Sequence, residues 1–505
     1  MFSSYRKLSD EFRNYSQLLQ SNPGNPDILK KLCKLSSQMG NHEIAEKLSG
    51  FLVKKFPENA AYHHSFGQTL YNNKKWSKAL EQFKTADDLH PSSPEILTSL
   101  AKIYEKLGQY KDALTEISKL EKIVKPTLSS GIMIARQFEK LNLNEKAHHK
   151  LIELDSAYPG NFEVKNAMGQ FFLKTRELSE AINWFNSAIS VSPDHAYSYW
   201  NFAIANLVEG NFNDGWKWYE KRRKIPGKKL PPIIDKLQQP ELTQVEIIQN
   251  KSILIISEEG FGDVIQFSRY ASLLKSAGAN NVYLHCRKPI KELMNCADNI
   301  DGAYDKLEQL PSFDNWILLL SLPHLFKTNF NNLPHNTPYI NPDERSFQLK
   351  NNPQTKLNVG VVWQTETEAP GDRFRSCPPE LFSNLFNINN VQFYSLQFSD
   401  QKEQISGISN VTNCAPMINS FMDTASIIKK MDLVITIDSA VAHLAGAMHK
   451  PVWMLTPHRV YDWRWFDAFQ DSSPWYPSMR IFRQTVDGDW ETILNEVKIE
   501  LTDLV

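Results

Sequence analysis

One segment places a carboxylate, a hydroxyl and a histidine around the expected start of a helix. The apolar run Leu433–Ile437 predicts a buried strand, and Asp438 and Ser439 follow it before the small apolar helix 440–448. The unpaired N–H groups and the positive dipole end of such a helix suit a phosphate. Asp438 and His443 would lie near that end. The alternative interpretation is that Asp438 only caps the helix and that His443 is a hydrogen-bonded core residue.

A second segment could supply an acid–base group. Residues 257–263 read SEEGFGD after the apolar run 252–257, and Gly260 and Gly262 permit a tight turn with close backbone approach to a ligand. Asp263 would then stand at a helix start where the loop opens into a cleft. A carboxylate in that position can take a proton from an attacking hydroxyl. Its alternative role is again a helix cap.

Neither segment favours a cofactor or a metal ion. The third glycine of a dinucleotide fingerprint is missing, since Ile265 lies nearest that spacing, and the next strand ends in 285–287 (HCR) without an acid for a ribose. A nicotinamide or flavin enzyme is therefore a poor fit, and we expect no cofactor. Asp487-Gly488-Asp489 has the D-x-D form that binds a metal nucleotide, but its place before the closing helix favours capping. We expect no metal site.

The first half of the chain is expected to be a helical repeat. Prolines fall at positions 23, 57, 91, 126, 159 and 193, in steps of 34, 34, 35, 33 and 34 residues. The residues between the prolines also recur. One repeat has Gly67, Ala79, Phe83, Ala86 and Pro91, and a later repeat has the same residue types at the same spacing, Gly169, Ala181, Phe185, Ala188 and Pro193. A period of about 34 residues is the signature of the tetratricopeptide repeat, a helix–turn–helix unit.

The concave face of such a solenoid is lined by the first helix of each pair. The polar and aromatic candidates for this face are His64, Gln68, Tyr71, Glu95, Lys102, Arg136, Glu163, Gln170 and Trp200. Their mixed charge suits hydrogen bonding to a peptide, so we expect a protein partner in this groove. A solvated face without a ligand is the alternative.

From Lys251 onward the pattern changes to alternating strands and helices. The predicted strands are Ser252–Ser257, Val282–His285, Trp316–Leu320, Asn358–Trp363, Val391–Leu396, Leu433–Ile437 and Val452–Leu455. This alternation predicts parallel sheets covered on both faces, and two such blocks predict a ligand cleft at the carboxyl ends of the strands. The expected fold is an all-α tetratricopeptide solenoid (residues 1–222), a proline-containing linker (223–250) and two α/β lobes (251–345 and 346–505). The basic residues 221–229 are expected to form a solvated helix end.

Composition narrows the class of partner. The 505 residues carry a net charge of −1, which gives no long-range attraction for nucleic acid or an anionic membrane. No apolar run is long enough to span a bilayer, and the polar N-terminus has no secretory h-region. The five cysteines lack a disulfide or metal-ligand spacing, so we expect a reducing, cytoplasmic setting.

Several motifs in order make the second half similar to glycosyltransferase family 9, which contains the heptosyltransferases and has the two-lobed GT-B fold. They are GFGDVIQFSRY at 260–270, YSLQ at 394–397, DSAVAH at 438–443, DWRWF at 462–466 and SPWYPSMRIFRQ at 473–484. The whole layout resembles a bacterial subgroup in which tetratricopeptide repeats precede such a module. This resemblance covers essentially the full chain.

The resemblance implies roles for individual residues. Asp263 matches the general base of the family. Asp438, Ser439 and Ala440 match the segment that holds the donor diphosphate at a helix start, and His443 matches the histidine of that helix. Ala440 replaces the glycine of the heptosyltransferases, so the backbone approaches a phosphate less freely.

Two further residues are implied at the donor side. Heptosyltransferases place a lysine two residues before a proline, whereas this chain has Arg375 one residue further away from Pro378. Arginine binds phosphate bidentately, but the departure leaves the donor open. Gln397, at the end of the YSLQ motif, is the other implied donor-binding residue.

The resemblance therefore implies an enzyme, a glycosyltransferase that moves a sugar from a nucleotide-sugar donor to a protein acceptor bound by the repeats. Flagellin or another surface protein is the implied acceptor. No metal is required, because a helix start and an arginine can stabilise the departing phosphate. Two alternatives stay open: an acceptor that is a lipopolysaccharide or surface polysaccharide, and a repeat scaffold whose transferase module only binds.

Overall fold

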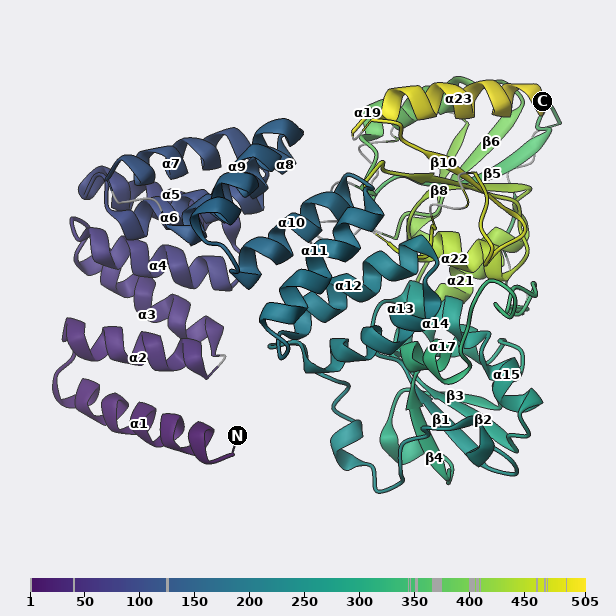
Figure 1. The fold of residues 1–505 in the computed structure, drawn as a ribbon, viewed down its shortest axis with the longest axis horizontal. Helices are drawn as coiled ribbons and strands as arrows, with labels where there is room; N and C mark the ends of the chain where they lie inside the picture. The colour runs from purple at the N-terminus through teal and green to yellow at the C-terminus, as the bar shows by residue number, and fades with distance from the viewer. Residues whose placement is uncertain are drawn as a thin grey trace. The chain divides into compact units, whose positions relative to one another are not determined.

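The computed structural model describes residues 2–505 except 40, 124–126, 344, 346, 350–352, 366–374, 399–404, 406, 407, 409, 460, 461, 467, 468, 470 and 487. The chain forms two compact units, Met1–Ala167 and Met168–Val505. Figure 1 shows the helical repeats in purple to blue and the two sheets in teal to yellow. The predicted domain limits at residues 222, 250 and 345 remain predictions.

Antiparallel helices follow one another through the first part of the chain, as the 34-residue period predicts. They are α1 (Phe2–Ser21), α2 (Pro26–Gln38), α3 (His42–Lys55), α4 (Ala60–Asn72), α5 (Trp76–Leu89), α6 (Pro94–Leu107), α7 (Tyr110–Ile123), α8 (Leu128–Lys140), α9 (Asn144–Ala157), α10 (Phe162–Lys174), α11 (Leu178–Val191), α12 (Ala196–Glu209) and α13 (Phe212–Tyr219). Local caps help to set their starts. The Asn25 side chain, for example, accepts hydrogen bonds from the N–H groups of Asp27 and Ile28.

The turn within each repeat uses the same left-handed backbone conformation. Positive φ angles occur at Lys74 (59°), Gly108 (70°), Asn142 (57°), Arg176 (66°) and Gly210 (91°), each 34 residues after the one before. Glycine and asparagine tolerate this conformation best, and a long side chain costs about 1 kcal/mol more. The spacing of these turns confirms the predicted phase of the repeat.

Glycine and phenylalanine pack each repeat in the way the sequence pattern predicts. A Cβ on Gly67 would lie 2.6 Å from the Phe83 ring, and a Cβ on Gly169 would lie 2.5 Å from the Phe185 ring. Both rings are almost fully buried. The matched small and aromatic positions therefore let the two helices of a pair touch.

The rest of the chain forms two parallel sheets, which confirms the predicted α/β class. The first sheet has the order β3-β2-β1-β4, from β1 (Ser252–Ile256), β2 (Asn281–His285), β3 (Gly302–Tyr304) and β4 (Asn315–Leu318). The second has the order β10-β9-β8-β5-β6-β7, from β5 (Leu357–Val362), β6 (Val391–Ser395), β7 (Val411–Asn413), β8 (Leu433–Ile437), β9 (Val452–Thr456) and β10 (Met479–Arg483).

The register of the second sheet aligns the carboxyl ends of four neighbouring strands. Val362 of β5 pairs with Thr436, Ile437 of β8 pairs with Leu455, and Arg483 of β10 pairs with Thr456. Ligands of open parallel sheets bind at this edge. The helices of the region are α14 (Phe261–Ser268), α15 (Ala271–Ser276), α16 (Lys288–Met294), α17 (Leu322–Leu325), α19 (Pro379–Phe382), α21 (Phe421–Lys429), α22 (Ala440–Ala447) and α23 (Trp490–Asp503).

The last repeat hairpin, α12–α13, packs on the α/β region within the second unit. The Trp216 indole donates to the Thr328 carbonyl at 2.9 Å, and its ring packs edge-on against Trp463 at 4.9 Å. Phe212 packs against both Phe330 and Phe466. The final repeat is therefore joined to the sheets by a shared aromatic core.

One expectation about the basic segment 221–229 is wrong. Arg222 is fully buried rather than solvated, and its guanidinium pairs with Glu258 at 2.6 Å and Glu220 at 2.6 Å. A buried arginine needs such partners because an uncompensated charge is costly away from water. Glu258 lies 36 residues later, so no local pattern indicates the pairing.

Candidate functional site

The two segments that could do chemistry lie directly against each other. Gly262 is the second residue of α14 and faces the first turns of α22. A Cβ on Gly262 would lie 2.8 Å from His443 Cδ2 and 3.6 Å from the Ala440 Cα. The glycine therefore permits the start of α14 to reach the start of α22. Asp263 and Ser439 are brought to the same edge of the fold by this contact.

Asp263 caps its own helix and is also paired with a cation. Its carboxylate accepts the backbone N–H of Gly260 at 2.7 Å and forms an ion pair with Arg464. The side chain keeps 17% of its surface exposed. Burial raises the pKa of Asp263, and the positive charge of Arg464 opposes that rise. Asp263 therefore supports the helix start from its third residue, while Gly260 occupies the N-cap position that the alternative gave to Asp263. The role of Asp263 as a base remains a prediction.

The sequence leaves Arg464 open between a phosphate contact and an exposed or structural ion pair, and the structure shows buried pairing. Its guanidinium donates to Asp263, to Gln266 and, at 2.8 Å, to both carboxylate oxygens of Asp462. Only 6% of its surface is exposed. Burial lowers the pKa of Arg464, but the carboxylates of Asp462 and Asp263 raise it by more. The net effect is a raised pKa, so the guanidinium stays charged. Arg464 therefore links the loop after β9 to α14.

Asp438 lies at the carboxyl end of β8 and is buried, with 3% exposure. Arg375 Nη1 approaches the Asp438 carbonyl at 3.4 Å and its carboxylate at 3.5 Å. Burial raises the pKa of Asp438, and Arg375 opposes the rise. The structure therefore brings together two of the predicted donor-side residues.

Ser439 occupies the N-cap position of α22 with extended backbone angles, φ −152° and ψ 170°. Its hydroxyl contacts Thr436 Oγ1 at 3.1 Å, and within the described part of the chain it accepts no hydrogen bond from the helix N–H groups. Ser439 therefore occupies the cap position without a side-chain hydrogen bond to the helix, and the roles of Asp438 and Ser439 at a donor remain predictions. The first N–H groups of α22, beginning at Ala440, suit an external acceptor.

His443 is a packed, neutral residue. Its Nδ1 lies 3.0 Å from the Tyr476 hydroxyl, and its ring stacks on Trp465 at 5.3 Å. Burial, followed by the positive charge of Arg464, lowers the pKa of His443 to about 3. His443 therefore fits the hydrogen-bonded core alternative and carries no charge near neutral pH.

Gln397 supports a loop with its side chain. Its Oε1 accepts the backbone N–H groups of Trp363 and Gln364, both at 3.0 Å, and only 2% of the residue is exposed. Gln397 therefore holds the backbone that follows β5 at the carboxyl edge of the sheet. A direct contact with a donor remains a prediction.

Arg269, within the GFGDVIQFSRY motif, had no role assigned from the sequence. It is buried and donates to the carbonyls of Pro334 and Trp475, both at 2.7 Å, and to the Tyr339 hydroxyl at 2.9 Å. These partners come from segments far apart in the chain. Arg269 therefore ties α14 to the segment that precedes β10.

The predicted groove residues fall in both units. His64, Gln68, Tyr71 and Arg136 belong to the first, and Gln170 and Trp200 belong to the second. His64 Nε2 bonds Ser99 Oγ at 2.9 Å, and exposed Gln68 lines a hollow with Lys30, Lys34 and Asn72. Binding of a protein at these positions remains a prediction.

Other predicted features can be placed briefly. The Asp489 carboxylate accepts the Thr492 N–H at 3.1 Å and so caps α23, while Asp487 lies outside the described residues. The described residues contain no group of three or more His, Cys, Asp or Glu side chains arranged to hold a metal ion. No helix in the described ranges has the length and apolarity needed to cross a bilayer.

Gly262→Ala is expected to lower the free energy of unfolding of the second unit by about 1–3 kcal/mol. The new methyl would overlap the His443 ring, which is held between Trp465 and Tyr476 and cannot easily move. Urea unfolding followed by tryptophan fluorescence measures the loss. Gly50→Ala is a control for a helical glycine, since a Cβ there would make only ordinary contacts with the Phe66 ring, at 3.5 Å or more; equal stability of Gly262→Ala and wild type would contradict the tight contact.

Comparison with known proteins gives two matches to family models. Residues 38–120 match subunit 3 of the anaphase-promoting complex, or cyclosome, and residues 399–465 match glycosyltransferase family 9 (heptosyltransferase). A crystal structure of a tetratricopeptide repeat protein from Parabacteroides merdae is similar, with a TM-score of 0.40 and 14% identity, over 46% of this chain and 97% of that one.

Two curated proteins illustrate the range of relatives. Protein FlbA of Caulobacter vibrioides is 19% identical to this chain, and the aligned region spans 95% of this chain and 90% of FlbA. The protein O-mannosyl-transferase TMTC1 of Homo sapiens is 22% identical, over 39% of this chain and 23% of its own length. This chain combines tetratricopeptide repeats with a C-terminal region similar to glycosyltransferase family 9, and the similarities support a glycosyltransferase activity.

Proposed function

We propose that this protein transfers a sugar from a nucleotide-sugar donor to a hydroxyl of a protein acceptor held by the repeats. The proposal is carried by one observation, the packing of α14 on α22, in which a Cβ on Gly262 would lie 2.8 Å from His443 Cδ2. This contact brings a partly exposed carboxylate, Asp263, to the helix start at Ser439. A base and an anion cradle at one edge are what glycosyl transfer from a phosphate needs.

The proposed reaction proceeds as follows. The acceptor hydroxyl oxygen attacks the anomeric carbon of the donor sugar, and its proton passes to the Asp263 carboxylate. The bond between the anomeric carbon and the donor phosphate breaks, and its electron pair leaves on the phosphate oxygen. The first N–H groups of α22, together with Arg375, stabilise the negative charge on the departing nucleotide. These groups take the electrostatic role that a metal ion has in other transferases.

Arg464 has a supporting role in this scheme. The pKa of Asp263 is raised by burial, which would favour the protonated form that cannot act as a base. The ion pair with Arg464 opposes that rise and keeps a larger fraction of Asp263 ionised. Arg464 is therefore a positioning residue for the base.

The name of TMTC1, a protein O-mannosyl-transferase, supports a protein acceptor for a chain that joins repeats to a transferase region. The hollow lined by Lys30, Lys34, Gln68 and Asn72 supports the same choice, because these four side chains can hydrogen-bond to a peptide. Flagellin or another surface protein is the acceptor class we would test first.

The test is a transfer assay with intact-protein mass spectrometry. The purified chain is incubated with nucleotide sugars in three reactions, which contain a flagellin, a lipopolysaccharide core or no acceptor. A mass gain of one sugar on the flagellin supports the proposal. Transfer to the lipopolysaccharide alone replaces the acceptor, and nucleotide binding without turnover towards any acceptor leaves the chain as a scaffold.

A further inference from the structure

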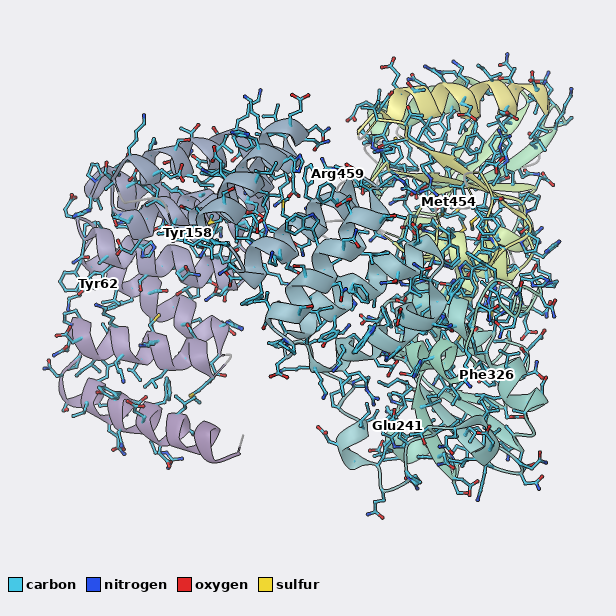
Figure 2. The ribbon with its side chains drawn as sticks, in the orientation of Figure 1. Tyr62, Tyr158, Glu241, Phe326, Met454 and Arg459 are labelled. Atoms are coloured by element: carbon cyan, nitrogen blue, oxygen red, sulfur yellow. The ribbon has the colours of Figure 1, made fainter. Side chains whose placement is uncertain are left out.

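A second cluster of cationic and polar groups lies at the carboxyl ends of β9 and β10. Arg483 is the last residue of β10 and pairs in register with Thr456, the last residue of β9. His458 follows β9 by two positions, and its Nδ1 lies 3.2 Å from the Gln484 carbonyl. Figure 2 labels Met454 in β9 and Arg459 in the loop that follows it. The cluster therefore lies at the edge where parallel sheets bind ligands.

The helical repeats contribute a residue to this cluster. Arg176 lies in the turn between α10 and α11, and its Nη1 donates to the His458 carbonyl at 3.0 Å. Arg176 and His458 are 282 residues apart in the chain but belong to the same compact unit. A guanidinium from a repeat turn is thereby held beside the end of β10.

Two donors at this place are buried and have no acceptor among the residues that the structure describes. Arg483 Nη2 donates to the Trp465 carbonyl at 2.9 Å, whereas its buried Nε has no hydrogen-bond partner among the described residues. Gln484 is 2% exposed; its Oε1 accepts the Gly488 N–H at 2.8 Å, but its Nε2 has no partner in the described ranges. Buried donors in proteins are normally satisfied, so two such donors on consecutive residues indicate an external acceptor.

The charges point to an anion as that acceptor. Burial lowers the pKa of Arg483 to about 10, and Asp438 opposes the fall. Burial and then the positive charge of Arg483 lower the pKa of Arg176 to about 10. Two buried guanidinium groups near each other are stabilised in their charged form by a nearby anion.

We propose that Arg176, Arg483 and Gln484 form an anion-binding site that takes the diphosphate of the donor nucleotide. β8 pairs with β9, so this site adjoins the helix start at Ser439 on the same edge of the sheet. The inference rests on the proposed function and deepens it: the repeat region completes the donor site through Arg176. The repeats are then required for donor binding as well as for holding an acceptor.

The backbone at Arg176 offers a variant that preserves the fold. Arg176 has φ 66°, and the equivalent turns at Gly108 and Gly210 use glycine. Arg176→Gly therefore removes the guanidinium and leaves the turn in a conformation that glycine prefers. Lys74→Gly is the matched control, because Lys74 occupies the equivalent turn of another repeat with φ 59°.

The experiment is isothermal titration calorimetry of the full chain with inorganic pyrophosphate and with uridine diphosphate. Arg176→Gly and Arg483→Gln are expected to weaken pyrophosphate binding at least 10-fold, Arg176→Lys less, and Lys74→Gly by less than 2-fold. Equal affinity of Arg176→Gly and wild type would overturn the inference, as would a wild type that binds neither probe. Thermal melts check that the variants fold.

The outcomes also separate this inference from the proposed function. Full sugar transfer by Arg176→Gly at low donor concentration would end the inference and leave the transferase intact. Pyrophosphate binding that depends on Arg176, in a protein that transfers nothing, would support the anion site and end the proposed function.

Discussion

Asp263→Asn is expected to lower kcat for sugar transfer by about 10²–10⁴-fold and to change the donor Kd by less than about 2-fold. Asparagine has nearly the same shape, and its side-chain oxygen can still accept the Gly260 N–H that Asp263 accepts at 2.7 Å. It cannot take a proton from the acceptor hydroxyl. The loss should therefore appear in kcat, as expected for an interaction needed only in the transition state.

A matched control for this variant exists in α21. Asp423 is the third residue of its helix, and its carboxylate accepts the N–H of the cap residue Ser420 at 2.9 Å. It also forms an ion pair with Arg345, just as Asp263 does with Arg464. Asp423→Asn should thus lose comparable stability and retain kcat. Turnover by Asp263→Asn close to that of Asp423→Asn would show that Asp263 is a cap and that the base lies elsewhere.

Arg464→Met is expected to lower the free energy of unfolding of the second unit by about 3–5 kcal/mol. The substitution removes the cation that contacts both Asp263 and Asp462. The site is buried, since only 6% of the Arg464 surface is exposed. Removing one partner of a buried ion pair is costly because the remaining charge is poorly solvated. Urea unfolding at pH 7 measures the loss.

The same variant should change the pH dependence of transfer. Arg464 lowers the pKa of Asp263 against the rise caused by burial, so its removal raises that pKa further. The ionised form of Asp263, which acts as the base, then appears only at higher pH. In a plot of kcat/KM against pH, the rise on the acidic side should therefore shift to higher pH. A profile measured from pH 5 to 9 shows the direction of the move.

A double variant distinguishes charge from packing in this network. Arg464→Met combined with Asp462→Asn removes one of the two uncompensated carboxylates, so part of the lost stability should return. If the double variant is no more stable than Arg464→Met, the arginine acts mainly through its packing against Trp463 and Phe267, which its guanidinium also contacts.

Local sequence determined the repeat and seven of the ten strands that the structure describes, whereas β3, β7 and β10 were not predicted. The phase of the 34-residue period follows from residues that meet within one helical pair, such as Gly169 and Phe185, and the structure confirms it. The buried strand Leu433–Ile437 and its following helix likewise depend on apolar periodicity over a few residues. Such contacts are close in the chain, so their spacing can be recognised without knowing the fold.

The residues around the candidate site were recognisable only in part. Gly262 and Asp263 belong to a segment with two glycines that follows a strand, and Ser439 stands at a helix start, so their types and positions indicate chemistry. The assignment of Asp263 as base and of Ser439 as phosphate cradle remains a prediction. His443 carries the same kind of signal, but its neutral, stacked environment depends on Trp465 and Tyr476, which come later in the chain.

Tertiary structure alone decided which partners the buried arginines contact. Arg464 and Asp263 are 201 residues apart, Arg222 and Glu258 are 36 apart, and Arg176 and His458 are 282 apart. An arginine has the same sequence signal whether it is solvated, paired or poised to bind an anion, because its long side chain tolerates all three environments. By itself the sequence determined the elements and the positions of reactive side chains within them, through short-range periodicity. The packing of α14 on α22, and of a repeat turn beside β10, decided their partners, because burial and Coulomb energies depend on distances that only the folded chain sets.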